Sequence, residues 1–134
     1  MQRKTVTTKI AKEIINEIVT ISEGYTRIGH DAFNYELKIQ EVILPAGIEI
    51  IDDSAFAFCS NMCSCTIPQS LVKIGDCSFF DCARLASLTL PENIKHIDHD
   101  AFRGCDNLTV YCPANSYSYR YCIKNSINVI GIES

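Results

Sequence analysis

Apolar residues recur along this chain with a 23-residue period. An isoleucine opens each unit, at Ile28, Ile51, Ile74 and Ile97. The fifth position after each isoleucine holds a phenylalanine, at Phe33, Phe56, Phe79 and Phe102. Later in each unit three apolar residues follow the pattern L-x-x-L-x-L, as in LASLTL at 85–90. This pattern is typical of a short parallel strand, and a repeat of this length predicts a solenoid.

The same columns predict how one unit is built. Its strand ends at a proline, which has no N–H to donate to a ladder, at Pro45, Pro68 and Pro91. In the fourth unit the 23-residue register puts Ala114 at the proline position and Tyr111 among the inward residues of the strand. A second extended piece, such as LVKI at 71–74, leads to the next isoleucine. Aspartates then cap a short helical or 3₁₀ turn, at Asp52, Asp53, Asp76 and Asp98.

The chain forms one domain with two ends to protect. We expect an N-terminal helical cap over 1–24, four repeats over 25–113 and a C-terminal cap over 114–134. Within the first cap, residues 8–20 place apolar side chains at helical spacing along one stripe, which predicts a helix laid on the first unit. Alternating tyrosines at 117, 119 and 121 are compatible with a strand as well as a helix in the second cap. If it is a helix, Tyr119 faces water.

Composition and charge exclude several classes of function. The 134 residues are 47% hydrophobic and 21% charged, which is ordinary for a globular domain. A net charge of -4 without a basic cluster gives no reason to expect a nucleic-acid partner. No apolar run approaches the ~20 residues of a membrane span, so membrane insertion is not expected. Lys12, Glu13 and Glu17 interrupt any signal-peptide core.

Eight cysteines are present, and three of them follow the period. Cys59, Cys82 and Cys105 are expected to form a column of buried thiols. Parallel Cβ atoms in neighbouring units lie about 4.8 Å apart, beyond disulfide range, so these side chains should remain thiols. The other cysteines show no zinc-ligand spacing. A chain rich in unpaired thiols favours a reducing compartment such as the cytoplasm, or a truncated form of a longer protein.

The stretch IDHDAFRGC at 97–105 gathers residues of metal and thiol chemistry. His99, with His96, forms an H-x-x-H pair, and a metal-dependent activity at these two histidines is one hypothesis. Structural roles explain the stretch better, because its residues fall in repeat columns and the Cys105 column points inward. No catalytic, cofactor-binding or metal-binding residue is assigned, and the chain also lacks G-x-S-x-G and phosphate-cradling glycine loops. We therefore expect a protein that is not an enzyme and holds no cofactor.

The register I-G-x-x-A-F-x-x-C-x-x-L-x-x-L-x-L-P resembles the BspA-like leucine-rich repeats over residues 25–113. The resemblance also implies that NSYSYRYCIKNSINV at 115–129 is a helix-plus-strand cap. Glu36 departs from the pattern, since it stands where later units have cysteine. The family implies a cell-surface or secreted protein that acts in adhesion and host-protein binding. This location conflicts with the thiol content and the missing signal peptide, so the compartment stays open.

Solenoids usually work by presenting an extended surface to a partner. In this chain that surface should be the outward side of the L-x-x-L-x-L strands. The candidate partner-binding residues are Gln40, Glu41, Ile43, Ser64, Thr66, Ala86, Ser87, Thr89 and Thr109. Cys63, Val110 and Cys112 share their columns and are also expected to face outward. The sequence thus predicts a protein–protein interaction module; the alternative is a structural, self-assembling homo-oligomer inside the cell.

Overall fold

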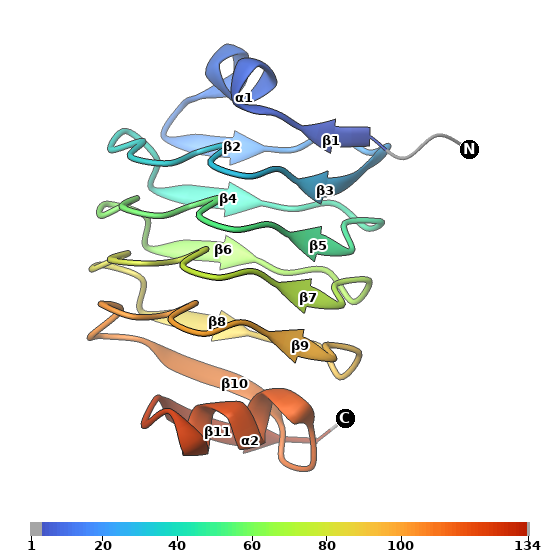
Figure 1. Ribbon diagram of the computed structural model, residues 1–134, viewed down its shortest axis with the longest axis vertical. Helices are drawn as coiled ribbons and strands as arrows, with labels where there is room; N and C mark the ends of the chain where they lie inside the picture. The colour runs from blue at the N-terminus through green and yellow to red at the C-terminus, as the bar shows by residue number, and fades with distance from the viewer. Residues whose placement is uncertain (1–3, 134) are drawn as a thin grey trace.

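The computed structural model describes residues 4–133, which wind into a stack of coils with two facing sheets of parallel strands (Figure 1). The five-strand sheet contains β1 (Lys4–Val6), β3 (Tyr25–Ile28), β5 (Ile50–Ile51), β7 (Lys73–Ile74) and β9 (His96–Ile97). The six-strand sheet contains β2 (Ile18–Thr20), β4 (Glu41–Ile43), β6 (Ser64–Thr66), β8 (Ser87–Thr89), β10 (Thr109–Pro113) and β11 (Asn128–Ile132). Helices α1 (Thr8–Ile14) and α2 (Tyr117–Lys124) lie at opposite ends of the stack (Figure 1). The predicted solenoid is confirmed.

The phenylalanine column forms one continuous row of rings inside the stack. Ring centroids are 5.3 Å apart for Phe33 and Phe56, and 5.5 Å apart for Phe56 and Phe79 and for Phe79 and Phe102. The planes of neighbouring rings differ by 20° or less, and all four side chains are buried. A single coil is too thin to enclose such a ring. Each ring is therefore buried by the coils above and below it.

The turn after each of β3, β5, β7 and β9 is not the helical or 3₁₀ turn that the sequence predicts. Within each turn, i to i+3 backbone hydrogen bonds close overlapping β-turns, for example Ala32 to Gly29, Asn34 to Asp31 and Glu36 to Phe33. Left-handed residues recur at the third and seventh positions after the isoleucine, at Asp31, Tyr35, Ser54, Phe58, Cys77, Asp81, Asp100 and Gly104. A helix cannot pass through these positions, because L-residues there have positive φ. The turn thus changes direction twice and directs the phenylalanine inward.

The cysteine column has a role that the sequence does not reveal. Cys59, Cys82 and Cys105 are buried as predicted. Each thiol donates a hydrogen bond to the carbonyl of the phenylalanine one coil earlier: Cys59 to Phe33 at 3.0 Å, Cys82 to Phe56 at 3.2 Å and Cys105 to Phe79 at 3.0 Å. A small side chain with a weak donor thus fits a column in which a buried carbonyl has a spare lone pair.

The N-terminal end is an additional coil rather than a helix alone. The predicted helix over 8–20 is wrong beyond Ile14: α1 covers only Thr8–Ile14, with the Thr7 hydroxyl accepting from the Ile10 N–H at 3.3 Å. The following β2 pairs with β4 residue for residue, including Val19 with Val42. Strand pairing gives β2 its backbone hydrogen bonds to β4 and buries Val19 completely. A helix continued through residue 20 would not do this.

The C-terminal end contains the helix and strand expected there. The Ser116 hydroxyl caps α2 by accepting from the Tyr119 N–H at 3.1 Å, so a strand over the tyrosines is excluded. Tyr117 and Tyr121 bind the last turn: the Tyr117 hydroxyl accepts from the Ile97 N–H, and the Tyr121 hydroxyl donates to the Asp98 carbonyl at 3.0 Å. Tyr119, which the helical alternative predicts to face water, is instead half-buried against the core. Among residues 4–133, neither helix has the length and apolarity needed to cross a membrane.

The buried thiols predict a loss of stability in alkali. Burial raises the pKa of the Cys59 thiol from 9.0 to about 12, so the native state keeps a proton that the unfolded chain loses. This contribution is complete below pH 9 and is lost as pH rises toward 12, at about 1.4 kcal/mol per pH unit. In urea unfolding between pH 9 and 11, Cys59→Ser should have a shallower pH slope than the wild type, because serine donates the same bond without ionising. Cys63→Ser, at an exposed thiol, is the matched control. Equal slopes for Cys59→Ser and wild type would contradict this account.

Candidate functional site

The outward side of the six-strand sheet forms a continuous surface across all of its strands. Strand pairing aligns its first column, which consists of Ile18, Glu41, Ser64, Ser87, Thr109 and Asn128. The second column, at the next outward position along each strand, consists of Thr20, Ile43, Thr66, Thr89, Tyr111 and Ile130. Glu17, Gln40, Cys63 and Ala86 directly precede their strands and complete what we call the six-strand face.

All nine residues predicted for partner binding lie on the six-strand face. The exposed ones are Gln40, Thr66, Ala86, Ser87 and Thr89, and the half-buried ones are Glu41, Ile43, Ser64 and Thr109. Gln40 and Ala86 belong to a backbone ladder ahead of the strands: the Cys63 N–H donates to the Gln40 carbonyl at 2.7 Å, and the Ala86 N–H donates to the Cys63 carbonyl at 3.4 Å. The coils thereby fix the spacing between successive side chains on the face.

The fourth repeat contradicts the 23-residue register in its strand. Thr109 pairs with Ser87 and Val110 with Leu88, so the step from β8 to β10 is one residue shorter than the period. Val110 and Cys112 are therefore fully buried, against the prediction that they face outward. Tyr111, predicted to point inward, takes the outward position between them. The same missing residue puts Pro113, rather than Ala114, at the proline position that follows Pro91.

The sequence reasoning missed the two ends of the six-strand face. The helical stripe assigns Ile18 and Thr20 to a helix, although Val19 and Ile21 lie one full period before Val42 and Leu44. That spacing was a usable signal. At the other end the alternation of Val110 and Cys112 with Tyr111, followed by Pro113, marked the shortened unit. Ile130 on β11 had no comparable signal, because the last strand follows a helix instead of a turn.

The two outer faces of the solenoid differ in charge. On the six-strand face Glu17 and Glu41 are the two charged residues among those defined above. The outer side of the five-strand sheet instead carries Arg27 and Lys73, which form ion pairs with carboxylates of the following coils: Arg27 with Asp52 at 3.7 Å and Lys73 with Asp98 at 3.9 Å. On the five-strand side, Arg27 and Lys73 are thus paired with carboxylates of the solenoid itself. Apart from Glu17 and Glu41, the six-strand face presents hydroxyl, amide, thiol and apolar groups.

The structure separates the candidate metal and thiol residues of 97–105. His96 lies on β9 with its Nε2 against the Asp98 carboxylate, whereas His99 lies in the following turn, 3.4 Å from Asp100 Oδ1. Each histidine therefore has its own carboxylate partner. Cys105 is buried with its thiol bound to the Phe79 carbonyl, which confirms that it points away from His99 and from solvent. The stretch is a structural turn.

Among residues 4–133, the group of potential metal-ligand atoms that lie close together is Asp76, Cys77 and Asp100, with neither histidine. Burial and the neighbouring Asp76 and Asp100 carboxylates raise the pKa of the Cys77 thiol. This shift disfavours the thiolate that a metal requires. The Asp100 carboxylate also forms an ion pair with Arg103 at 3.6 Å. The group therefore adds no support to a metal-dependent activity.

Comparison with known proteins extends the match beyond the four predicted repeats. A family model described as BspA type leucine rich repeat region matches residues 11–130 in six copies. The sequence predicts four repeats, and the six-strand sheet has six strands. No curated protein sequence matches the chain significantly.

Several solved structures share the fold. The pneumococcal vaccine antigen PcpA is 23% identical with a TM-score of 0.70, over 72% of this chain and 24% of that chain. A leucine rich cell surface protein from Faecalibacterium prausnitzii is 24% identical with a TM-score of 0.74, over 87% of this chain and 32% of that chain. A leucine-rich repeat protein from Bacteroides ovatus is 27% identical with a TM-score of 0.66, over 86% of this chain and 33% of that chain. The matched part thus covers a quarter to a third of each of these three chains.

The corrected register of β10 predicts opposite effects for neighbouring residues. Val110→Asp buries an unpaired carboxylate and should reduce the free energy of unfolding by about 3 kcal/mol or more. Tyr111→Asp changes an outward residue and should cost no more than about 1 kcal/mol. Urea unfolding of both variants measures the difference. A larger loss for Tyr111→Asp would restore the uniform 23-residue register.

Proposed function

The chain belongs to the BspA-type leucine-rich repeat family, and on this premise we propose that it is a non-enzymatic binding module whose partner protein docks on the six-strand face. Family membership implies protein–protein interaction. The observation that supports this face is its continuity: aligned outward columns cross six strands with a single carboxylate among them. Threonine, serine and isoleucine side chains lose little hydration free energy when a partner covers them, compared with charged groups.

The opposite side of the solenoid supports the same choice. Covering the five-strand sheet would desolvate Arg27, Lys73 and their carboxylate partners, which already satisfy one another. A partner would have to replace those interactions before gaining any of its own. The six-strand face has no such cost except at Glu17 and Glu41. Its rigid backbone ladders also mean that little conformational entropy is lost on binding.

For the partner class we propose proteins at a cell surface, with host matrix adhesion as the process. One similar structure is a cell surface protein and another is a vaccine antigen, which supports a role in surface recognition. Sequence identities of 23% and 24% to these neighbours do not indicate a shared partner. The partner must therefore be sought by direct binding measurements.

A charge-insertion experiment tests both the activity and the face. Biolayer interferometry should detect wild-type protein binding to a member of a panel of purified extracellular-matrix proteins. Thr66→Arg/Thr89→Arg places two guanidinium groups at exposed mid-face positions and should weaken this binding at least about tenfold, a cost of about 1.4 kcal/mol. Gln69→Arg/Val72→Arg adds the same charge at exposed positions in the loop before β7, and should bind like the wild type.

Two outcomes would contradict this proposal in different ways. If the wild type binds no matrix protein, the adhesion role is wrong. If both double variants lose binding equally, the interaction is a general charge effect and the six-strand face is not the docking site.

Self-assembly is the second candidate function, and the Cys63 thiol is the observation that favours it. This thiol is exposed at the start of the six-strand face, so two copies that meet at this face bring their Cys63 thiols together. In a purified sample, dissolved oxygen then takes two electrons and two protons from the two thiols and leaves an intermolecular disulfide that reports the assembly. Size-exclusion chromatography with light scattering should then show a dimer without reductant, and a monomer with reductant or after Cys63→Ser. A monomer under all three conditions, independent of concentration, would exclude this role.

A further inference from the structure

Successive turns are joined by a ladder of backbone hydrogen bonds that runs in one direction. The N–H groups at the fifth and seventh positions after each isoleucine donate to carbonyls of the next coil. In the first pair of turns, Phe33 donates to Ala55 at 2.7 Å and Tyr35 to Ala57 at 2.8 Å. In the last pair, Phe79 donates to Ala101 at 2.8 Å and Asp81 to Arg103 at 2.7 Å. Each turn therefore requires acceptors from the turn that follows.

The ladder ends at the turn after β9, where no further turn of this kind follows among the described residues. The equivalent donors are the N–H groups of Phe102 and Gly104, and neither has a backbone or side-chain acceptor among residues 4–133. The Phe102 carbonyl also lacks the thiol donor that each earlier phenylalanine carbonyl receives from the next coil. The Phe102 carbonyl still accepts from the Cys105 N–H at 3.0 Å, whereas an unpaired N–H group is costly when it is shielded from water.

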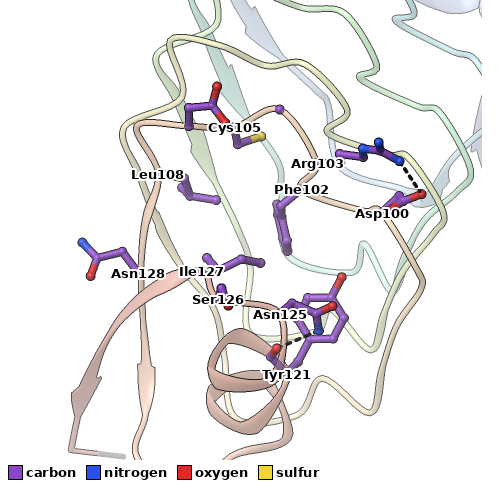
Figure 2. A pocket seen from close by; sticks show the side chains of 12 residues that line it. Asp100, Phe102, Arg103, Cys105, Leu108, Tyr121, Asn125, Ser126, Ile127 and Asn128 are labelled. Carbon is purple, nitrogen blue, oxygen red and sulfur yellow. Dashed lines mark hydrogen bonds and ion pairs between the residues drawn. The ribbon is translucent and has the colours of Figure 1, made fainter.

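The C-terminal cap replaces only part of the missing turn. The Tyr121 ring takes the place of the next phenylalanine, edge-on to Phe102 with centroids 6.4 Å apart. Ile127 is half-buried against the core next to Leu108 (Figure 2). An open cavity of about 390 Å³ remains beside the Tyr121 and Ile127 side chains. Its lining also includes Phe102, Gly104 and Asp106. This volume lies within the ~300–1,000 Å³ of small-ligand sites.

The charges around the cavity favour a neutral ligand over an anion. Its lining contains two carboxylates, Asp100 and Asp106, and one cation, Arg103, which forms an ion pair with Asp100. The free donors on Phe102 and Gly104 are two residues apart, and they match two carbonyls with the same spacing in a peptide, as Phe33 and Tyr35 match the carbonyls of Ala55 and Ala57. A polypeptide backbone therefore matches the cavity better than a phosphate or carboxylate does.

We propose that this cavity binds a short peptide segment of another protein, which takes the conformation of the chain's own turns and continues the turn ladder beyond Gly104. Two carbonyls of the segment accept from the N–H groups of Phe102 and Gly104. A small thiol or hydroxyl side chain donates to the Phe102 carbonyl, as the cysteine column does within the stack. This is strand addition transferred from a sheet edge to a turn edge. The site shares Asn128 with the edge of the six-strand face, and its binding does not depend on docking there.

A synthetic peptide based on the chain's own turn is the probe. It is acetyl-Ala-Gly-Ala-Phe-Cys-Ser-Asn-amide, which copies residues 55–61 with glycine at the position of Phe56, because Tyr121 already fills that ring position. In NMR titrations under reducing conditions, the amide protons of Phe102 and Gly104 should shift downfield and exchange at least about tenfold more slowly. The amides of Phe33 and Tyr35, which already donate to the next coil, should not respond.

Two tryptophan variants locate the binding site. Asp106→Trp places a bulky side chain at the exposed rim of the cavity and should weaken binding of the peptide at least about tenfold. Ala83→Trp makes the same change at the equivalent exposed position one coil earlier, where the ladder is complete, and should leave binding unchanged. The proposal is overturned if the amide protons of Phe102 and Gly104 do not shift in the wild type at about 5 mM peptide, because this concentration exceeds the Kd of any specific site of this kind. It is also overturned if a scrambled peptide gives the same shifts, or if both variants lose binding equally.

Discussion

Each coil of this solenoid depends on the next coil to satisfy its buried backbone. The turns place phenylalanine rings inside the stack, and the carbonyl and N–H groups beside each ring have no partner within the coil beyond its short β-turn bonds. They are completed by carbonyls and a cysteine thiol of the following coil, at 2.7–3.2 Å. This dependence explains why phenylalanine and cysteine recur together, and why two positions per turn adopt left-handed conformations that non-glycine residues rarely accept.

The same dependence makes the ends of the stack different from its middle. At the N-terminal end α1 replaces the turn and buries Ala11 where the inner coils bury a ring. At the C-terminal end α2 contributes the Tyr121 ring but no carbonyls for Phe102 and Gly104. The strands, by contrast, continue without interruption into β2 and β11. A continuous face and an unfinished turn ladder thus arise from one architecture, and they are the two surfaces to which we assign binding.

Prediction from the sequence succeeded where residues of neighbouring coils carry the same side chain. The row of Phe33 to Phe102, the buried thiols and the surface position of Thr66 and Thr89 follow from columns of like residues. The prediction failed where a local pattern along the chain competed with the repeat of like residues between coils. Ile10, Ile14 and Ile18 have helical spacing, yet Ile18 belongs to a strand, because pairing with Glu41 supplies backbone bonds that the helical spacing does not reveal.

By itself the sequence determined the architecture and the inward or outward position of most side chains, because a 23-residue period repeats the same burial in every coil. Only the tertiary structure decided the register of β10, where the loss of one residue exchanges Val110 with Tyr111. The reason is physical: a strand's register is set by hydrogen bonds to the strand one coil away, and counting along the chain cannot show whether that coil keeps the full period or falls one residue short. The unpaired amides of Phe102 and Gly104 are likewise a property of the stack, since they arise where no following turn accepts their bonds.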